Sequence, residues 1–190
     1  YPGGWTNYSA RVSEDRENWT LAPTDYADGK HTIHVQPESN ALWVAYFAPY
    51  SMERHHDLIA WAANQPGAAV QELGQTLDGQ PLDMVRLGEG PKQVWLYARQ
   101  HPGETMAQWW VEGALERLCD GEDSVARLLR QEATFHIIPN MNPDGSRRGH
   151  LRTNAAGVNL NREWAAPSMD RSPEVFVVRA EMDRTGVDFA

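Results

Sequence analysis

Short apolar runs alternate with longer segments of helical periodicity in the second part of the chain. Short stretches at 93–98 and 134–138 are rich in apolar residues, which predicts two buried strands. Apolar residues at helical spacing predict helices over 104–118 and 125–132. Strands that alternate with helices indicate an α/β sheet with helices packed against it.

Three neighbouring segments extend this pattern. Val70–Thr76 and Leu82–Leu87 flank the turn sequence Leu77-Asp-Gly-Gln-Pro81, which predicts a hairpin. Before it, Ser51 is placed to cap a helix that runs to about Asn64.

The end of the chain has its own start and stop signals. Ser172 is a helix cap, Pro173 suits the first helical position, and Gly186 ends the helix. Residues 187–190 then have the composition of a beginning strand. A domain seldom stops there, so we expect the chain to be a fragment.

The first 49 residues have a different pattern. Residues 31–35 alternate and residues 41–47 are rich in strand formers, with a turn signal at Ala27-Asp-Gly29 before them. These features predict part of a small β-domain at 1–49, followed by the α/β domain at 50–190.

Composition and charge narrow the possible partners. With 190 residues, 41% of them hydrophobic and 23% charged, the chain has the makeup of an ordinary domain with a core. A net charge of −9 argues against nucleic acid as a partner, and no apolar run is long enough to span a membrane. A single cysteine fits a reducing compartment. Against this acidic background four arginines crowd into one short span and predict a local anion site: Arg147, Arg148, Arg152 and Arg162.

A candidate metal site follows the first buried strand. His101-Pro-Gly-Glu104 places an imidazole and a carboxylate at the carboxyl edge of the sheet, where functional groups gather in such folds. Gly103 is expected to let the backbone turn sharply, so that both groups converge. They are suitable ligands for zinc, although this pattern alone also fits a solvated turn with a helix-starting glutamate.

A second polar cluster follows the second buried strand. It begins at Asn140 and continues through the arginine-rich span to Val158-Asn-Leu-Asn-Arg-Glu-Trp164. Arginine matches a carboxylate with its planar fork, and nearby asparagine amides complete a site for a small anion. A metal site and a carboxylate clamp at one sheet edge suggest an enzyme that recognises a chain end.

Four motifs in this order resemble the zinc metallocarboxypeptidase family related to carboxypeptidase A, and most closely its cytosolic carboxypeptidase branch. They are Arg99-Gln-His-Pro-Gly-Glu-Thr105, Asn142-Pro-Asp-Gly145, Leu151-Arg-Thr-Asn154 and Asn159-Leu-Asn-Arg-Glu-Trp164. The resemblance implies a carboxypeptidase-like mixed sheet flanked by helices, preceded by part of a small β-sandwich. It covers about residue 41 to the end of the chain.

The resemblance also implies roles for five residues and the cofactor Zn²⁺. His101 and Glu104 would be zinc ligands, and Arg152 would polarise the scissile carbonyl and steady its oxyanion. Asn161 and Arg162 would hold the terminal carboxylate of a peptide or protein. The implied activity is cytoplasmic removal of C-terminal residues, with acidic glutamate tails as one candidate substrate.

Two features of the family pattern are missing from these residues. The third zinc ligand, a later histidine, and the glutamate general base are both absent, and His150 is the only plausible substitute ligand. Two alternatives therefore stay open. One is a zinc amidase or deacylase on the same scaffold, and the other is a catalytically incomplete binding fragment.

Overall fold

A computed structural model describes residues 2–190, and the chain divides into two compact units, Tyr1–Pro49 and Tyr50–Ala190. Each unit has its own sheets and is described separately. Within the described residues, no helix has the length and apolar character that crossing a membrane requires.

The first unit consists of short strands in two small antiparallel sheets. The order β2-β1-β5 forms one sheet, and the hairpin β3-β4 forms the other. Its elements are η1 (Pro2–Trp5), β1 (Arg11–Ser13), β2 (Thr20–Leu21), β3 (Thr24–Ala27), β4 (Lys30–Ile33) and β5 (Trp43–Ala45). The turn predicted at Asp28 and Gly29 joins β3 to β4, and both residues have positive φ, of 50° and 74°.

The second unit is built on a four-stranded mixed sheet in the order β6-β7-β9-β8. Its strands are β6 (Ala68–Gln75), β7 (Pro81–Leu87), β8 (Lys92–Tyr97) and β9 (Ala133–Ile138). β6 and β7 form the predicted antiparallel hairpin, β7 is antiparallel to β9, and β8 runs parallel to β9. The predicted α/β class with a mixed sheet and flanking helices is confirmed.

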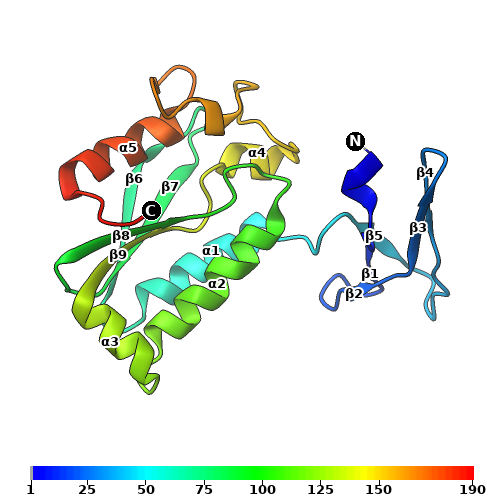
Figure 1. Ribbon diagram of the computed structural model, residues 1–190, viewed down its shortest axis with the longest axis horizontal. Coiled ribbons are helices and arrows are strands. Elements are labelled where there is room, and N and C mark those ends of the chain that lie inside the picture. Colours follow the sequence, from blue (N-terminus) through cyan, green and yellow to red (C-terminus); the bar gives the residue numbers. More distant parts are fainter. Residues whose placement is uncertain (1) are drawn as a thin grey trace. The chain divides into compact units, whose positions relative to one another are not determined.

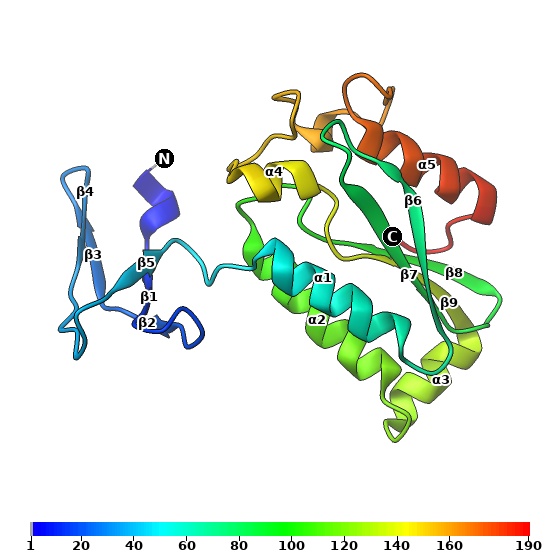
Figure 2. The same cartoon turned by 180° about the vertical axis from the view of Figure 1, so that it is seen from behind.

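Helices cover both faces of this sheet (Figures 1 and 2). The helices α1 and α2 lie on one face and α5 lies on the other, while α4 lies at the end of the sheet. The bounds are α1 (Met52–Ala63), α2 (Thr105–Cys119), α3 (Ser124–Glu132), α4 (Pro143–Arg148), η2 (Leu160–Arg162) and α5 (Pro173–Thr185).

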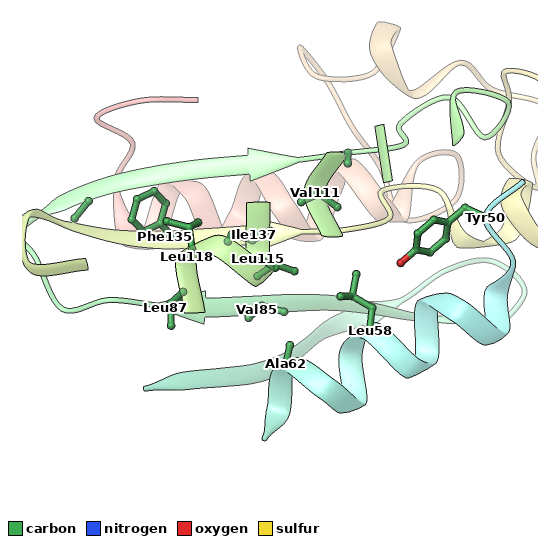
Figure 3. Packing of buried hydrophobic residues seen from close by; sticks show 12 residues of the cluster. Tyr50, Leu58, Ala62, Val85, Leu87, Val111, Leu115, Leu118, Phe135 and Ile137 are labelled. Carbon is green, nitrogen blue, oxygen red and sulfur yellow. The ribbon is translucent and has the colours of Figure 1, made fainter. Parts of the chain in front are cut away.

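Two apolar clusters fill the spaces between sheet and helices. The larger cluster joins Leu58 of α1 and Leu115 of α2 to Val85 and Ile137 of the sheet, as Figure 3 shows. The second cluster joins the opposite sheet face to Val175 and Val178 of α5. Burial of these faces is the main force that holds the helices on the sheet.

The structure corrects the prediction in three places. No helix is predicted in the polar cluster that follows β9, but α4 forms at Asn142-Pro-Asp-Gly145, where Asn142 caps the helix and Pro143 occupies its first turn. Ser172 precedes α5 as predicted, but its hydroxyl bonds Glu163 instead of capping the helix. Residues 187–190 make only an isolated parallel bridge, between Phe189 and Val94 of β8.

Candidate active site

The parallel pair β8 and β9 brings the two polar clusters together. Both strands end at the same edge of the sheet, so His101 and Asn142 follow neighbouring strand ends. Backbone bonds continue the pairing past the strands, from Ala98 N to Ile138 O and from Met141 N to Ala98 O, each 2.9 Å long. Asn142 Nδ2 then donates to Gln100 O over 3.2 Å.

The turn that carries the candidate ligands is shaped differently from the prediction. Its left-handed residue is Arg99, with φ 52°, and Gly103 has no positive φ. Gly103 is needed because Leu151 approaches it: a Cβ there would lie 2.7 Å from Leu151 Cδ1 and 2.9 Å from Leu151 O. The glycine permits close packing between the turn and the arginine-bearing loop.

The structure brings the side chains of His101 and Glu104 together. His101 is buried, and its Nδ1 lies 3.0 Å from Glu104 Oε1. Its Nε2 lies 3.0 Å from Oδ1 of Asn159, in the loop that precedes η2. Asn159 is therefore also a residue of the candidate site. Both Asn159 and Asn161 belong to the motif that ends at Trp164, and the sequence alone does not show which of them contacts His101.

These contacts determine which nitrogen of His101 carries the proton. Asn159 Oδ1 also accepts from the backbone N–H of Asn161 over 3.1 Å, which identifies this atom as the oxygen. His101 Nε2 is therefore the donor, and neutral His101 presents a lone pair from Nδ1 to the Glu104 carboxylate. Two acceptors at 3.0 Å require a proton or a metal cation between them.

Zinc fits this pair of atoms. Two ligands of one tetrahedral zinc ion lie roughly 3.4 Å apart when each bond is about 2.1 Å long. The observed 3.0 Å is close to this spacing, and imidazole nitrogen with carboxylate oxygen is a common zinc donor set. A histidine that binds zinc through one ring nitrogen also typically donates a hydrogen bond from the other, as Nε2 does here to Asn159.

The candidate substrate residues lie on the exposed side of the site. Arg152 is half exposed, with Nη1 3.7 Å from Glu104 Oε1, so its charge lies beside the candidate metal position. Arg162 is exposed, and its Nη1 donates to the carbonyl of the neighbouring Asn161 over 3.2 Å. Asn161 is joined to the site through its backbone bond to Asn159. The guanidinium groups therefore face solvent, where a carboxylate can reach them.

One of the four arginines in the expected anion site has another partner. Arg148 makes a two-pronged pair with Asp78 of the β6–β7 turn, with N–O distances of 2.7 and 2.6 Å. Arg147 is exposed. Asp144 of the Asn-Pro-Asp-Gly motif is buried and binds the same turn, accepting from Thr76 Oγ1 over 2.5 Å. This motif therefore fixes α4 to the hairpin and offers no free carboxylate.

A glycine also joins α4 to the candidate metal turn. A Cβ on Gly145 would lie 2.4 Å from Pro102 Cγ and 2.5 Å from Thr153 O. The helix, the turn and the arginine loop thus meet at a point with no room for a side chain.

Within the described residues, the pair has no third side chain with which to hold a metal ion. In residues 2–190, no three His, Cys, Asp or Glu side chains gather in a metal-binding arrangement. His150 does not substitute, because its Nδ1 faces the carbonyls of Thr153 and Asn154, both at 3.2 Å. His136 is buried in the sheet, stacked on Trp95.

Two glutamates near the arginine loop have structural partners. Glu163 accepts from the Ser172 hydroxyl over 3.4 Å and lies 3.5 Å from Arg171, so it supports the loop. Glu174 is buried, and burial raises the pKa of its carboxyl to about 7. It accepts from Asn154 Nδ2 over 3.2 Å, and the Asn154 side-chain oxygen in turn accepts from two loop N–H groups.

Comparison with protein families identifies the fold and the motifs. Residues 56–176 match the zinc carboxypeptidase family, and residues 1–47 match the cytosolic carboxypeptidase N-terminal domain. The chain belongs to the zinc carboxypeptidase family. The resemblance recognised in its four motifs is thereby confirmed.

Individual carboxypeptidases agree with this assignment. A metallo-carboxypeptidase structure from Burkholderia cenocepacia matches all of the chain, with 51% identity and a TM-score of 0.94. One from Pseudomonas aeruginosa, in complex with (2-guanidinoethylmercapto)succinic acid, matches 98% of it, with 41% identity and a TM-score of 0.91. Human cytosolic carboxypeptidase 4 is 35% identical over 72% of the chain. The chain spans 53% and 51% of the two bacterial carboxypeptidases and 14% of the human protein.

Proposed function

We propose that the chain carries the metal-binding turn and carboxylate clamp of a zinc-dependent metallocarboxypeptidase that removes C-terminal residues from peptides or proteins. The observation that carries this proposal is the approach of His101 Nδ1 to Glu104 Oε1 at 3.0 Å, with Nε2 already bonded to Asn159. The arrangement provides two ligand atoms oriented toward one cation.

In this proposal residues 50–190 are the N-terminal half of the catalytic domain. Residues 1–49 are the C-terminal part of a small β-sandwich domain that precedes it. The third zinc ligand and the general base belong to parts of the enzyme outside this chain. The chain covers about half of each of two bacterial carboxypeptidases, which supports this division.

Three residues act on the substrate in this proposal. Arg162 and Asn161 bind the terminal carboxylate, a charge that the substrate carries throughout. Arg152 lies beside Glu104 and stabilises the negative charge that develops on the scissile carbonyl oxygen. Zinc, when bound, would lower the pKa of its water toward neutrality.

The substrate is proposed to have an acidic C-terminus, such as a glutamate tail. Arg147, Arg152 and Arg162 are exposed within one span, which would attract a substrate with several carboxylates. The Pseudomonas carboxypeptidase binds a succinic acid derivative that carries a guanidino group beside its two carboxylates, which agrees with a carboxylate clamp. We also propose a cytoplasmic location, which agrees with the names of the cytosolic carboxypeptidase relatives.

The test is amino-acid release by the full-length enzyme that contains this chain. We expect release from peptides ending in Glu, Lys or Leu, with the highest kcat/KM for Glu, and loss of release when the C-terminus is amidated. Preference for N-acyl amino acids over peptides would instead indicate the amidase or deacylase. Binding of peptides without hydrolysis by the zinc-loaded enzyme would indicate a binding protein.

A further inference from the structure

A chain of polar side chains, three of them buried, lies behind the candidate metal turn. It runs from Arg99, two residues before His101, through Gln108 of α2 and His55 of α1 to Asp83 of β7. Gln108 is fully buried, and Arg99 is only 6% exposed. We call these four residues the buried relay.

The side chain of Arg99 holds the turn by donating to its backbone. Its Nε donates to Pro102 O over 3.0 Å, and its Nη1 donates to Tyr50 O over 2.8 Å and to Gln108 Oε1 over 2.7 Å. Pro102 lies between the two candidate ligands, so the bond to its carbonyl restricts the position of both. In the described part of the chain, no carboxylate forms an ion pair with Arg99.

A buried guanidinium without an ion pair is costly, so its bonds to neutral acceptors must be well oriented. Burial also lowers the pKa of Arg99 to about 10, which still leaves the group charged at neutral pH. The planar fork lets one side chain bond the turn, the start of α1 and α2 together. Lysine has a single nitrogen and lacks this geometry.

The relay has a fixed direction. Arg99 can only donate, so the Gln108 atom that faces it is the oxygen, and Gln108 Nε2 donates to His55 Nδ1 over 3.0 Å. His55 therefore carries its proton on Nε2, which faces Asp83 Oδ2 at 3.3 Å. Every member of the relay has a partner that suits its donor or acceptor role, from the cation at Arg99 to the anion at Asp83.

We propose that Arg99 is a positioning residue for the zinc-binding turn, and that Gln108 and His55 hold its guanidinium in place. The inference rests on the proposed function, because it concerns how His101 and Glu104 are presented to zinc. Gln108 lies one helical turn after Glu104 on α2, so the relay fixes the second ligand as well as the turn.

The experiment compares zinc affinity of the full-length enzyme by competition with a chelator. Gln108→Met fills a similar volume but removes both relay bonds, and we expect zinc to bind about tenfold more weakly or worse. Gln108→Glu keeps an acceptor for Arg99, and a His55 protonated on both nitrogens can donate to it and to Asp83, so affinity should stay within about threefold of the unaltered enzyme. In Gln108→Met reconstituted with saturating zinc, kcat should fall and KM should change little.

Leu115→Ala is the matched control. Leu115 is fully buried on the same helix and belongs to the larger apolar cluster. This change destabilises the fold, but zinc affinity of the folded enzyme should be retained. If Gln108→Met does not fold, Arg99→Lys replaces it, with the same expected loss of affinity because the bonds to Pro102, Tyr50 and Gln108 cannot all form.

Two results would overturn the inference. One is unaltered zinc affinity in Gln108→Met or Arg99→Lys, and the other is an equal loss in Leu115→Ala, which would show a general effect of destabilisation. Both differ from failure of the proposed function, in which the unaltered enzyme itself would bind no zinc.

Discussion

The turn at His101–Glu104 and the loop that bears Arg152 and Arg162 are two halves of one site, but they are supported in opposite ways. His101 is buried, and bonds from Asn159 and the buried relay hold the turn. The two arginines are exposed, and their guanidinium groups make few contacts within the chain. The fold thus fixes the proposed metal-binding side in advance and leaves the proposed substrate-binding side open to solvent.

The largest expected effects come from the exposed arginines. Arg152→Ala should lower kcat by about 10²–10³-fold, because it removes stabilisation of charge that develops only in the transition state. Arg162→Ala should mainly raise KM, by about tenfold or more, because its partner carries its charge in substrate and transition state alike. Steady-state kinetics of both variants in the full-length enzyme measures the split.

The effect of the same two variants on folding stability tests the comparison a second time. Both side chains are exposed, so each change should alter the free energy of unfolding by less than about 0.5 kcal/mol. Equal effects on kcat and KM from both variants, or a large loss of stability from either, would contradict the division into fixed and open sides.

A second prediction concerns the support of the arginine loop by Glu174. Its carboxyl pKa is raised to about 7, first by burial and then by the nearby Asp144 charge, while the bond from Asn154 opposes the rise. The pKa of Glu174 is 4.5 in the unfolded state and about 7 in the folded state. Between pH 4.5 and pH 7 the unfolded state has therefore lost a proton that the folded state still holds. Folding stability from this group is thus present at low pH and is lost as pH rises through 7.

The size of this loss can be measured against a neutral variant. Relative to Glu174→Gln, the unaltered protein should lose about 3 kcal/mol of unfolding free energy between pH 4.5 and pH 8. Urea denaturation of both proteins across this range provides the measurement. A difference that does not change with pH would show that Glu174 titrates as an ordinary carboxyl.

A third prediction tests the contact between the two halves. Gly145→Ala should destabilise the protein by about 1–3 kcal/mol, because its Cβ has no room beside Pro102 and Thr153. Gly113→Ala is the control, since that glycine is in α2 with open space around it, and it should stabilise by about 0.5–1 kcal/mol. Equal urea midpoints for the two variants would mean that α4 can move away at little cost.

The smallest effect is expected at Arg148. Its pair with Asp78 is partly exposed, so Arg148→Ala should cost about 1 kcal/mol or less, and less at high salt. Activity on acidic peptides should be unchanged, because this arginine binds the hairpin. A large rise in KM would show that Arg148 contributes to substrate binding.

The sequence was informative wherever local rules decide the outcome. The hairpin around Gly79, the strands predicted at 93–98 and 134–138 and the end of α5 at Gly186 follow from turn chemistry and periodicity, and the structure has all of them. Both strands were predicted to be buried. β9 is buried throughout, but β8 is the last strand of the four-stranded sheet and only its Trp95 is buried. The juxtaposition of His101 with the second polar cluster also follows, since parallel strands end at one edge.

Other features depend on contacts between distant segments, which no local pattern contains. The short helix α4 is stabilised by Asn142 and by its packing on Pro102. Asn159 bonds His101 across 58 residues, and Gly103 is required by Leu151 and not by its own φ. The relay from Arg99 to Asp83 joins three elements, so a lone buried histidine at position 55 gave no sign of it.

Zinc content tests the central claim most directly. The full-length enzyme, purified and dialysed against metal-free buffer, should retain about one zinc ion per chain by mass spectrometry of the metal. His101→Ala should retain almost none while keeping its circular dichroism spectrum. A zinc-free unaltered enzyme with full peptidase activity, or a His101→Ala variant that keeps its zinc, would contradict the account.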